Sequence, residues 1–542
     1  MKTHLFFLII FLFLASCSSN SGTKDNDNNS NDYDNVITDV DETSQIQDID
    51  STVDADVTDN PEFLAGPYGI NFGDTAGDFT IPTEKGDWDF AQNRSENESY
   101  IFIFYKPSNI QSTAIWKTDF IRFADKSPDN AHYFFLVDAT QETFEERVSQ
   151  LKTNIETAFT IVENNDLRDR IHIASKPVDD FDSWLSQWLD NTSDFFLGID
   201  RFQKLRKGGL FHSWRSSAND PQFEFVYKEA ELYNYEYDLE RDYSLNEKTV
   251  RIKGIEGIPF PEEGWVKELF FEADFPELPS NGKLFIELEQ VCQLESDCEW
   301  DRIEHLHICD ATDSDICDIE MGRWITTYGR SGKWVTDITP LIPLIKKGKN
   351  KFKFSVAGDQ YTNYLDFLFV PDEESSSPLE IHSLYSGTTQ FNEEYNTKFE
   401  EITLDIPANA KKVFISAYIT GHGNGSEQEN CAEFCKFESI FNVNGTDFEI
   451  DFNNAGTDRG CFDLVNEGVV PNQSGSWPFG RAGWCPGQDV KLINIDITDK
   501  VITGTNTFSY KALLNGEIYE PVVTNPDGYR AEIPLTSYIV IW

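Results

Sequence analysis

Cysteine spacing constrains the fold of this 542-residue chain more than any other feature of its sequence. Apart from Cys17, every cysteine lies beyond residue 290, and the eight of them fall in pairs that are close in sequence. We therefore expect four short-range disulfides: Cys292–Cys298, Cys309–Cys317, Cys431–Cys435 and Cys461–Cys485. Sequence alone allows many other connectivities. Zinc bound at the CxxxC spacing is the rival interpretation, but the spacings lack a CxxC partner and we expect the chain to be exported.

Two of the predicted cysteine loops place an acid in a fixed position. The segment CQLESDCEWDR, at residues 292–302, puts Asp301 three residues after a cysteine, and CAEFC puts Glu433 between two cysteines. Because so short a loop cannot bury its own side chains, we expect Glu433 to point outward from a rigid bend. Two positioned acids suit the hydrolysis of a stable bond, one activating water and the other orienting it or assisting the leaving group.

The first residues indicate export. After Lys2, an apolar run at residues 5–14 ends in Leu-Ala-Ser-Cys at residues 14–17. The run is shorter than the about 20 residues that a membrane-spanning helix needs, and it fits a signal-peptide core. The tetrapeptide resembles the lipobox of bacterial lipoproteins, in which the cysteine is acylated. We therefore expect residues 1–17 to be a lipoprotein signal peptide and Cys17 to anchor the protein in the bacterial cell envelope, at the outer membrane. An ordinary secretory signal is the alternative.

A strongly acidic segment follows. Residues 18–60 contain eleven Asp and one Glu against Lys24 alone, so they cannot bury enough apolar surface to order themselves and predict a disordered tether. Weak calcium binding is the alternative for its Asp pairs, although no EF-hand pattern is present. The formal net charge of the chain is −50. Such a balance disfavours nucleic acid as a partner, because phosphate binding needs clustered Lys and Arg.

Residues 62–197 carry an α/β pattern. Strand-like runs at residues 100–105, 133–137 and 171–174 alternate with amphipathic segments, the first of which begins near residue 143. The stretch GPYGINFGDTAGDFTIP resembles the opening of a thioredoxin- or peroxiredoxin-type domain. Redox chemistry in that family needs a cysteine after the first of these strands, where this chain reads YKPSNIQST. We therefore expect a redox-dead docking or spacing domain, followed by a connector at residues 198–246.

From residue 247 onward the pattern is all β. Alternating apolar and polar residues recur in short runs separated by Gly, Asn, Asp and Pro, at residues 283–289, 351–356, 364–370, 412–418, 447–452 and 538–542. The length suits two β-sandwiches. We place them at residues 247–372 and 378–542, with the break in the acidic, Ser-rich stretch between them.

Four segments of this region resemble, in order and spacing, those of the peptide-N-glycosidase F family: CQLESDCEWDR, GRWITTYGRSGKWVTDIT, CAEFC and PNQSGSWPFGRAGWCPG. The resemblance implies two eight-stranded jelly-roll sandwiches with an active site at their interface. It implies hydrolysis of the amide bond between asparagine and the innermost N-acetylglucosamine of N-linked glycans, giving aspartate and a glycosylamine without a cofactor. The implied substrates are N-glycosylated proteins or glycopeptides, and we expect a monomer.

The same resemblance implies roles for individual residues. Asp301 matches the principal catalytic acid of the family, and Glu433 matches the glutamate that binds and orients water. The positions that match the sugar site are Arg302, Arg481, Trp484, Phe434 and His422, with Trp484 as a stacking plane. Phe434 and His422 stand where the family has tryptophan. The third acid of the family aligns with Ala357, and Asp359 in the altered loop is a candidate to replace it.

Alternatives stay open at this point. A surface lectin that binds N-glycans without cleaving them is the second functional class. Asp301 could form a structural salt bridge with Arg302 or Arg323, and Trp484 could belong to the core. The pair His305 and His307 on one strand face could suggest copper, but the further His and Met ligands of such a site have no counterpart here.

Overall fold

The computed structural model describes residues 62–542 apart from residues 108–111, 114–115, 117–119, 139–140, 163, 182–183, 191–195, 209–223, 294–297, 299, 311–315 and 472–475. The predicted signal peptide, Cys17 and the tether at residues 18–60 lie outside the described residues. In the part that is described, no helix is both long and apolar enough to cross a bilayer.

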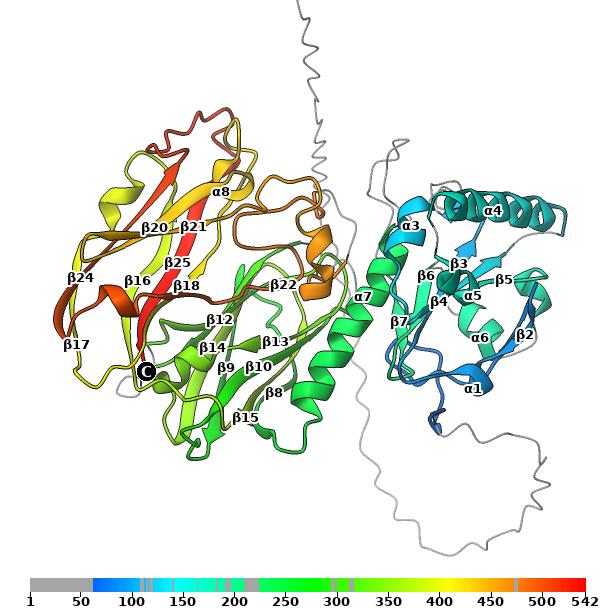
Figure 1. The fold of residues 1–542 in the computed structure, drawn as a ribbon, viewed down its shortest axis with the longest axis horizontal. Helices are drawn as coiled ribbons and strands as arrows, with labels where there is room; N and C mark the ends of the chain where they lie inside the picture. Colours follow the sequence, from blue (N-terminus) through cyan, green and yellow to red (C-terminus); the bar gives the residue numbers. More distant parts are fainter. Residues whose placement is uncertain are drawn as a thin grey trace, which may run out of the picture. The chain divides into compact units, whose positions relative to one another are not determined.

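The first unit is a five-stranded sheet with helices, coloured from blue through cyan to blue-green in Figure 1. Its strand order is β5-β4-β3-β6-β7, with the bounds β3 (Ser99–Tyr105), β4 (Ala131–Val137), β5 (Ile171–Ile173), β6 (Phe196–Ile199) and β7 (Leu205–Lys207). The first three strands pair in parallel, whereas β6 and β7 are antiparallel. A hairpin precedes the sheet, β1 (Thr80–Thr83) and β2 (Gly86–Asp89). The helices are α1 (Phe90–Asn93), α3 (Ile121–Lys126), α4 (Gln141–Ile161), α5 (Asn165–Arg170) and α6 (Trp184–Asp190).

Burial explains these elements. Every residue of β3 is buried, as expected of a central strand covered on both faces. Helix α4 buries Phe144, Val148, Leu151 and Ile155, the face that its 3.6-residue period predicts. The α/β pattern is thus present, but the predicted boundary at residue 197 is wrong. Strand β6 pairs with β3, and β7 pairs with β6, so the sheet continues to Lys207.

The connector region contains helix α7 (Glu224–Leu239), which packs into the core rather than linking domains loosely. Its Glu229 forms a buried ion pair with Arg330 of the following β region, with 2.7 Å between Nη1 and Oε1. The same guanidinium donates from Nη2 to the carbonyl oxygen of Lys207 over 3.1 Å. One arginine therefore joins the α/β sheet, α7 and the β region.

The region after residue 247 is two sandwiches, drawn green and yellow to red in Figure 1. The strands of the first are β8 (Val250–Pro259), β9 (Val266–Phe275), β10 (Gly282–Val291), β11 (Ile303–Ile308), β12 (Ile319–Ile325), β13 (Gly332–Asp337), β14 (Gly348–Ala357) and β15 (Thr362–Pro371). The main strands of the second are β16 (Glu380–Gln390), β17 (Ile402–Ile406), β18 (Val413–Ile419), β20 (Phe437–Val443), β21 (Thr446–Asp451), β23 (Ile493–Asp496), β24 (Gly504–Leu514) and β25 (Tyr529–Ile541). The predicted break between residues 372 and 378 falls between β15 and β16.

Both sandwiches have a jelly-roll order. The first pairs sheet β13-β10-β15-β8 with sheet β12-β11-β14-β9, and the second pairs β16-β25-β18-β23 with β17-β24-β20-β21. In each sandwich, one sheet places the first strand beside the last: β8 lies next to β15, and β16 lies next to β25. Such pairing of strands from the two ends of the sequence is typical of the double Greek key. The short strand β19 (His422–Asn424) pairs with β25. The predicted all-β sandwich region is confirmed.

The sandwiches are joined by strand pairing and by buried polar groups. Strand β22 (Gln488–Asp489), which lies late in the sequence, pairs with β12 and completes the sheet of the first sandwich. Arg323 on β12 is held by two 2.8 Å hydrogen bonds to the carboxylate of Glu320. Its Nη1 donates across the junction to Thr420 and to the carbonyl oxygen of Pro534, each over 2.9 Å. Because these groups are buried and satisfied, they fix the junction.

All four predicted disulfides are present: Cys292–Cys298, Cys309–Cys317, Cys431–Cys435 and Cys461–Cys485. Each closes a loop within one sandwich, and three of the four lie in or beside the segments that carry the candidate site.

Candidate active site

Glu433 lies on the short helix α8 (Cys431–Phe434), which the 431–435 disulfide closes. The expectation that it points outward is wrong: Glu433 is only 7% exposed. Its Oε2 accepts from the backbone N–H of Gly423 over 3.2 Å, and its carbonyl oxygen accepts from the N–H of Ala482 over 2.9 Å. The loop itself cannot bury the side chain, but two segments distant in sequence close over it. Glu433 is therefore a fixed, largely desolvated carboxylate.

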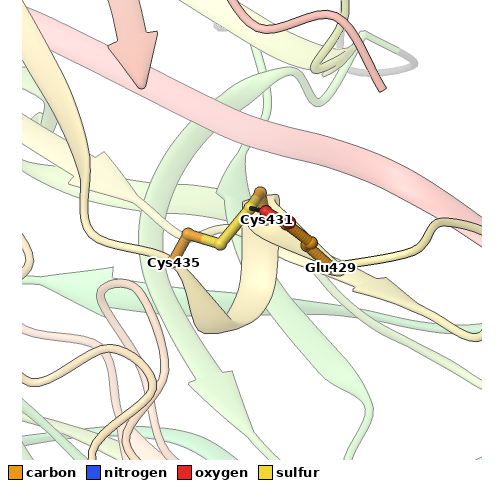
Figure 2. A group of neighbouring side chains, drawn as sticks. All are labelled: Glu429, Cys431 and Cys435. Carbon is orange, nitrogen blue, oxygen red and sulfur yellow. Dashed lines mark hydrogen bonds between the residues drawn. A yellow bond between two sulfur atoms is a disulfide. The ribbon is translucent and has the colours of Figure 1, made fainter. Parts of the chain in front are cut away.

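The cysteines of α8 are committed to each other. Figure 2 shows the disulfide between Cys431 and Cys435, with the exposed Glu429 beside it. Within the described residues, this trio is the group in which three potential metal-ligand atoms come together. Zinc binds cysteine as the thiolate, and sulfurs joined in a disulfide cannot supply it. The loop thus positions Glu433, which is the role that the sequence suggested for it.

Asp301 comes from the first sandwich, in the segment just before β11, and its side chain is 19% exposed. The Tyr328 hydroxyl donates to its carboxylate, and Nη2 of Arg481 lies 3.7 Å from its Oδ2. Among the described residues the ion pair of Asp301 is thus with Arg481, rather than with the Arg302 or Arg323 that the sequence offered. By side-chain exposure, Asp301 is the less buried of the two predicted acids.

Arg481 connects the two predicted acids. Its Nε lies 3.1 Å from Oε1 of Glu433, while its Nη1 donates to the carbonyl oxygens of Ser476 and Phe479 over 3.2 and 2.9 Å. The side chain is almost fully buried. Backbone acceptors on one side of the guanidinium and carboxylates on the other hold it in one orientation. Sequence resemblance placed Arg481 in the sugar site, and the structure makes it the bridge between the acids.

Burial and neighbouring charges shift the pKa values of both carboxyl groups. Burial raises the pKa of Glu433 to about 7, and the charge of Asp301 adds to the rise, while Arg481 and the Gly423 N–H oppose it. Burial also raises the pKa of Asp301, against the opposing influence of Arg481 and the Tyr328 hydroxyl. A carboxyl group with a pKa near neutrality, as Glu433 has, can accept and return a proton at physiological pH, as acid–base catalysis requires.

Asp359 is a third acid in the same neighbourhood. It lies in the turn after Ala357, the last residue of β14, and is buried. Its Oδ2 accepts from the backbone N–H of Trp300 over 3.2 Å and from the hydroxyl of Thr326 over 3.4 Å. Burial raises the pKa of Asp359 to about 7, and the charge of Asp301 contributes to the rise. The altered loop thus brings an acid close to Asp301 although the aligned strand position holds alanine.

Trp484 and His422 are buried against each other. Their rings stack with centroids 4.6 Å apart, and the indole Nε1 of Trp484 donates to the carbonyl oxygen of Gly421 over 2.6 Å. The guanidinium of Arg481 lies 4.8 Å from the Trp484 ring. Burial holds the pKa of His422 well below its ordinary value, so the ring is neutral. The expectation of Trp484 as an open stacking plane is wrong, because His422 and Arg481 cover it. Phe434 is partly exposed, beside Arg481 at 5.3 Å.

Unlike Trp484, two other tryptophans in this part of the first sandwich are exposed. Trp265 is 64% exposed and Trp300 is 48% exposed, and the guanidinium of Arg302 lies 5.1 and 6.0 Å from their ring centroids. We call these three residues the Trp-Arg-Trp rim. Trp300 directly precedes Asp301 in the CEWDR motif, so its sequence position could have identified it as a candidate site residue. Trp265 lies in the turn between β8 and β9, where the sequence offers no such signal.

His305 has a structural partner, whereas Nδ1 of His307 is buried without a hydrogen bond to any described residue. Nδ1 of His305 lies 2.7 Å from Oε1 of Glu320, the carboxylate that also holds Arg323. Burial lowers the pKa of His307 to about 4. The pair belongs to the junction between the sandwiches, and it is not one of the groups of converging ligand atoms in the described part of the chain.

Comparisons with known proteins point to the peptide-N-glycosidase F family. Residues 390–540 match the family described as "Peptide-N-glycosidase F, C terminal". The resemblance to the peptide-N-glycosidase F family is confirmed. A curated relative from Elizabethkingia miricola, peptide-N(4)-(N-acetyl-beta-D-glucosaminyl)asparagine amidase F, is 26% identical over 253 residues, which is 42% of this chain and 66% of the relative. The match thus spans just under two thirds of that relative's length.

Solved structures of the peptide-N-glycosidase F family are also similar. The PNGase F structure from Flavobacterium meningosepticum is 19% identical, covering 54% of this chain and 95% of that chain with a TM-score of 0.44. A structure of PNGF-II is 14% identical, covering 55% of this chain and 65% of that chain with a TM-score of 0.42. The family match at residues 390–540 includes Glu433.

Proposed function

We propose that this protein hydrolyses the amide bond between asparagine and the innermost N-acetylglucosamine of N-linked glycans, giving aspartate and a glycosylamine. The observation that carries the proposal is the convergence of Asp301 and Glu433, from different sandwiches, on the single guanidinium of Arg481. The amidase from Elizabethkingia miricola supports the assignment by its name and its similarity.

The geometry suggests a division of labour between the acids. Asp301, the more exposed of the two, takes a proton from water as the water oxygen adds to the side-chain carbonyl carbon of asparagine. Glu433 accepts a hydrogen bond from that water and holds it, while Arg481 fixes both carboxylates. When the C–N bond breaks, the proton passes to the departing nitrogen of the glycosylamine. Asp359, with a pKa of about 7, is placed to exchange a proton near Asp301.

The Trp-Arg-Trp rim supplies a sugar-binding surface for this reaction. Exposed indole rings offer apolar faces for the C–H groups of a sugar ring, and Arg302 between them offers N–H donors for sugar oxygens. The rim is contiguous with the acids, since Trp300 directly precedes Asp301 in the chain and its backbone N–H donates to Asp359. Phe434 adds a partly exposed ring on the side of Glu433.

The decisive experiment is incubation of the purified protein with a denatured N-glycoprotein, followed by mass spectrometry of the released glycan and of the peptide. We expect a glycan with both core N-acetylglucosamine residues and aspartate at the former glycosylation site. A peptide that retains one N-acetylglucosamine would indicate an endoglycosidase. An intact glycopeptide that binds the protein would indicate the lectin instead.

The lipid anchor, the outer-membrane location and the monomeric state are further proposals. They rest on the residues at positions 14–17 and on the acidic tether. Metabolic labelling with a fatty acid that is lost in Cys17→Ala, together with fractionation of the envelope, tests the first two. Light scattering on a soluble form tests the third.

The N-terminal unit is proposed to be thioredoxin-like. Its sheet, with three parallel strands flanked by an antiparallel pair, supports the resemblance that the sequence suggested. Between Cys17 and Cys292 the sequence has no cysteine, so thiol chemistry has no carrier there. Comparison of turnover on glycopeptides and on whole glycoproteins, with and without residues 62–207, tests a docking or spacing role.

A further inference from the structure

A cavity of about 640 Å³ lies away from the candidate active site. Its lining comes from both sandwiches: Lys283, Asp337, Thr339, Pro340, Glu374, Ser375, Ser376, Lys411, Lys412, Phe414, Lys491, Leu492, Asn494 and Trp542. We call it the lysine cavity. Its size lies within the range of roughly 300–1,000 Å³ that small-molecule sites occupy.

The lysine cavity lies at the far end of strands that start or finish at the candidate active site. Strand β18 begins at Val413, next to Lys412, and ends at Ile419, shortly before His422. Seven residues at about 3.3 Å each separate the two ends by roughly 20 Å. Strand β10 likewise carries Lys283 near its start and leads to the Cys292 loop at its end. The two sites are therefore distinct.

The charge of the lysine cavity opposes that of the molecule. The chain has 94 Asp and Glu against 44 Lys and Arg, yet the lining holds four lysines and two carboxylates, those of Asp337 and Glu374. In so acidic a protein, a concave site ringed by cations concentrates positive potential and attracts anions.

Two of the four lysines are available to a ligand. Lys491 pairs with buried Asp489 at 2.6 Å, and Lys283 lies 3.9 Å from Asp372. Lys411 and Lys412 are exposed, and among the described residues neither forms an ion pair within 4.0 Å. Their backbone N–H groups bond to the carbonyl oxygen of Trp542, which anchors the segment while leaving both ammonium groups free to move. Lys412 interacts with the exposed Asp496 at longer range. Two adjacent ammonium groups outside any close ion pair are a binding element for an anionic group.

The floor of the lysine cavity is aromatic. Phe414 and Trp542 meet edge to face with centroids 5.0 Å apart, and Nε1 of Trp542 donates to the carbonyl oxygen of Ser376 over 3.0 Å. The indole is thus fixed in orientation while it remains partly exposed. Asn494 and Thr339 supply amide and hydroxyl groups around it. A rigid apolar face surrounded by hydrogen-bonding groups suits the ring of a sugar.

We propose that the lysine cavity binds an acidic saccharide, one whose sugar ring carries a carboxylate or a sulfate. The ring lies on Trp542, its hydroxyl groups bond to Asn494 and Thr339, and its anionic group lies between Lys411 and Lys412. An inorganic anion would use the lysines but would leave the aromatic floor and most of the volume unfilled. The site is independent of the proposed amide hydrolysis.

Calorimetric titration of the full chain with sialyllactose tests the proposal, with lactose as the neutral counterpart and inorganic sulfate as the bare anion. We expect sialyllactose to bind, lactose to bind at least about tenfold more weakly, and added salt to weaken sialyllactose binding because the contact is ionic. Equal affinity for lactose would overturn the role of the lysines. Sulfate binding tighter than sialyllactose would overturn the assignment to a saccharide.

Variants test the lysine pair and the aromatic floor of the lysine cavity separately. Lys411→Gln combined with Lys412→Gln should weaken sialyllactose binding at least about tenfold, since charge-assisted contacts are lost. The control, Lys347→Gln with Lys349→Gln, changes the net charge equally at exposed lysines outside the lining and should bind as the parent does. Trp542→Ala should weaken sialyllactose without weakening sulfate. Thermal unfolding verifies that each variant is folded, and unchanged binding in the folded lysine variant would refute the proposal.

Discussion

Arg481 donates from Nε to Oε1 of Glu433 over 3.1 Å, so the acid on α8 is tied to a cation that reaches it from a loop 48 residues further along the chain. The other edge of the same guanidinium faces Asp301 of the first sandwich. Since one cation lies between both carboxylates, the charge of either acid affects the proton affinity of the other. The charge of Asp301 thus contributes to the raised pKa of Glu433.

Asp301→Asn should lower kcat by at least about 10²-fold, because an amide keeps the shape of the side chain but cannot accept the proton of water. Affinity for a glycopeptide and the thermal unfolding temperature should change little. Kinetics on a dansylated glycopeptide measure the loss. Asp463→Asn, at an exposed position, serves as the control and should retain full turnover. Substantial turnover by Asp301→Asn would remove Asp301 from the mechanism.

Glu433→Gln should remove an ionisation from the pH dependence of kcat/KM. Because burial raises the pKa of Glu433 to about 7, the carboxylate form that holds water predominates only above that pH. We expect kcat/KM of the parent to rise through pH 7 and that of the variant to be low and without this step. A glutamine offers a single acceptor for the Arg481 and Gly423 donors, so one of them is left unpaired. A variant profile with the same inflection would assign the step to another group.

Trp265→Ala should raise KM for glycopeptides about three- to tenfold with little change in kcat, because stacking on an exposed ring contributes about 0.5–1.5 kcal/mol to ground state and transition state alike. Trp265→Phe retains a ring and should restore most of the affinity. Initial-rate measurements over a range of glycopeptide concentration separate the two constants. A fall in kcat at constant KM would mean that Trp265 acts on the acids through Arg302 instead.

Glu304→Gln should flatten the pH dependence of stability. Burial raises the pKa of Glu304 to about 8 from an ordinary value of 4.5, and Gln290 donates to it over 2.7 Å. Its protonated form is favoured in the folded state, so the stabilisation is full below pH 4.5 and is lost as pH rises to about 8, by roughly 1.4 kcal/mol per pH unit. Urea unfolding of both proteins at several pH values yields the difference. Parallel curves would contradict the prediction.

Glu229→Ala should lower the free energy of unfolding by about 3–5 kcal/mol, because it leaves the buried Arg330 without its carboxylate. Denaturant unfolding measures the change. The control is Glu277→Ala, whose partner Lys347 forms an exposed pair, and we expect its effect to stay below about 1 kcal/mol. Equal effects in the two variants would mean that α7 contributes little to the stability of the β region.

Local sequence patterns predicted much of this fold. Alternation along strands such as β14, with every second residue buried, marked the sandwiches, and the spacing of Phe144, Val148, Leu151 and Ile155 marked a helix. The disulfides followed from short cysteine spacing. These features depend on neighbours in sequence, so a single chain reveals them. The boundary at residue 197 was misplaced because the pairing of β6 with β3 spans almost a hundred residues.

The site was less accessible to sequence reasoning. The motifs located Asp301 and Glu433, but the burial of Glu433 depends on Gly423 and Arg481, which arrive from other segments. Trp484 is not the open face that the sequence suggested, because His422 on β19, more than sixty residues earlier, stacks on it. Trp265 became a candidate because a turn in the first sandwich places it, exposed, beside Arg302. Exposure is a property of the assembled fold, and motif spacing does not report it.

The pairing of β22 with β12 has a consequence for how the chain folds during synthesis. Residues 488 and 489 complete a sheet whose other strands end by residue 357, so the edge of β12 stays unpaired while more than a hundred further residues are made. An open strand edge invites pairing with other chains. The sheet of the first sandwich can therefore be completed only after residue 488 has been synthesised. A chain that stops before residue 488 should be bound by chaperones or degraded by proteases rather than fold into an active fragment.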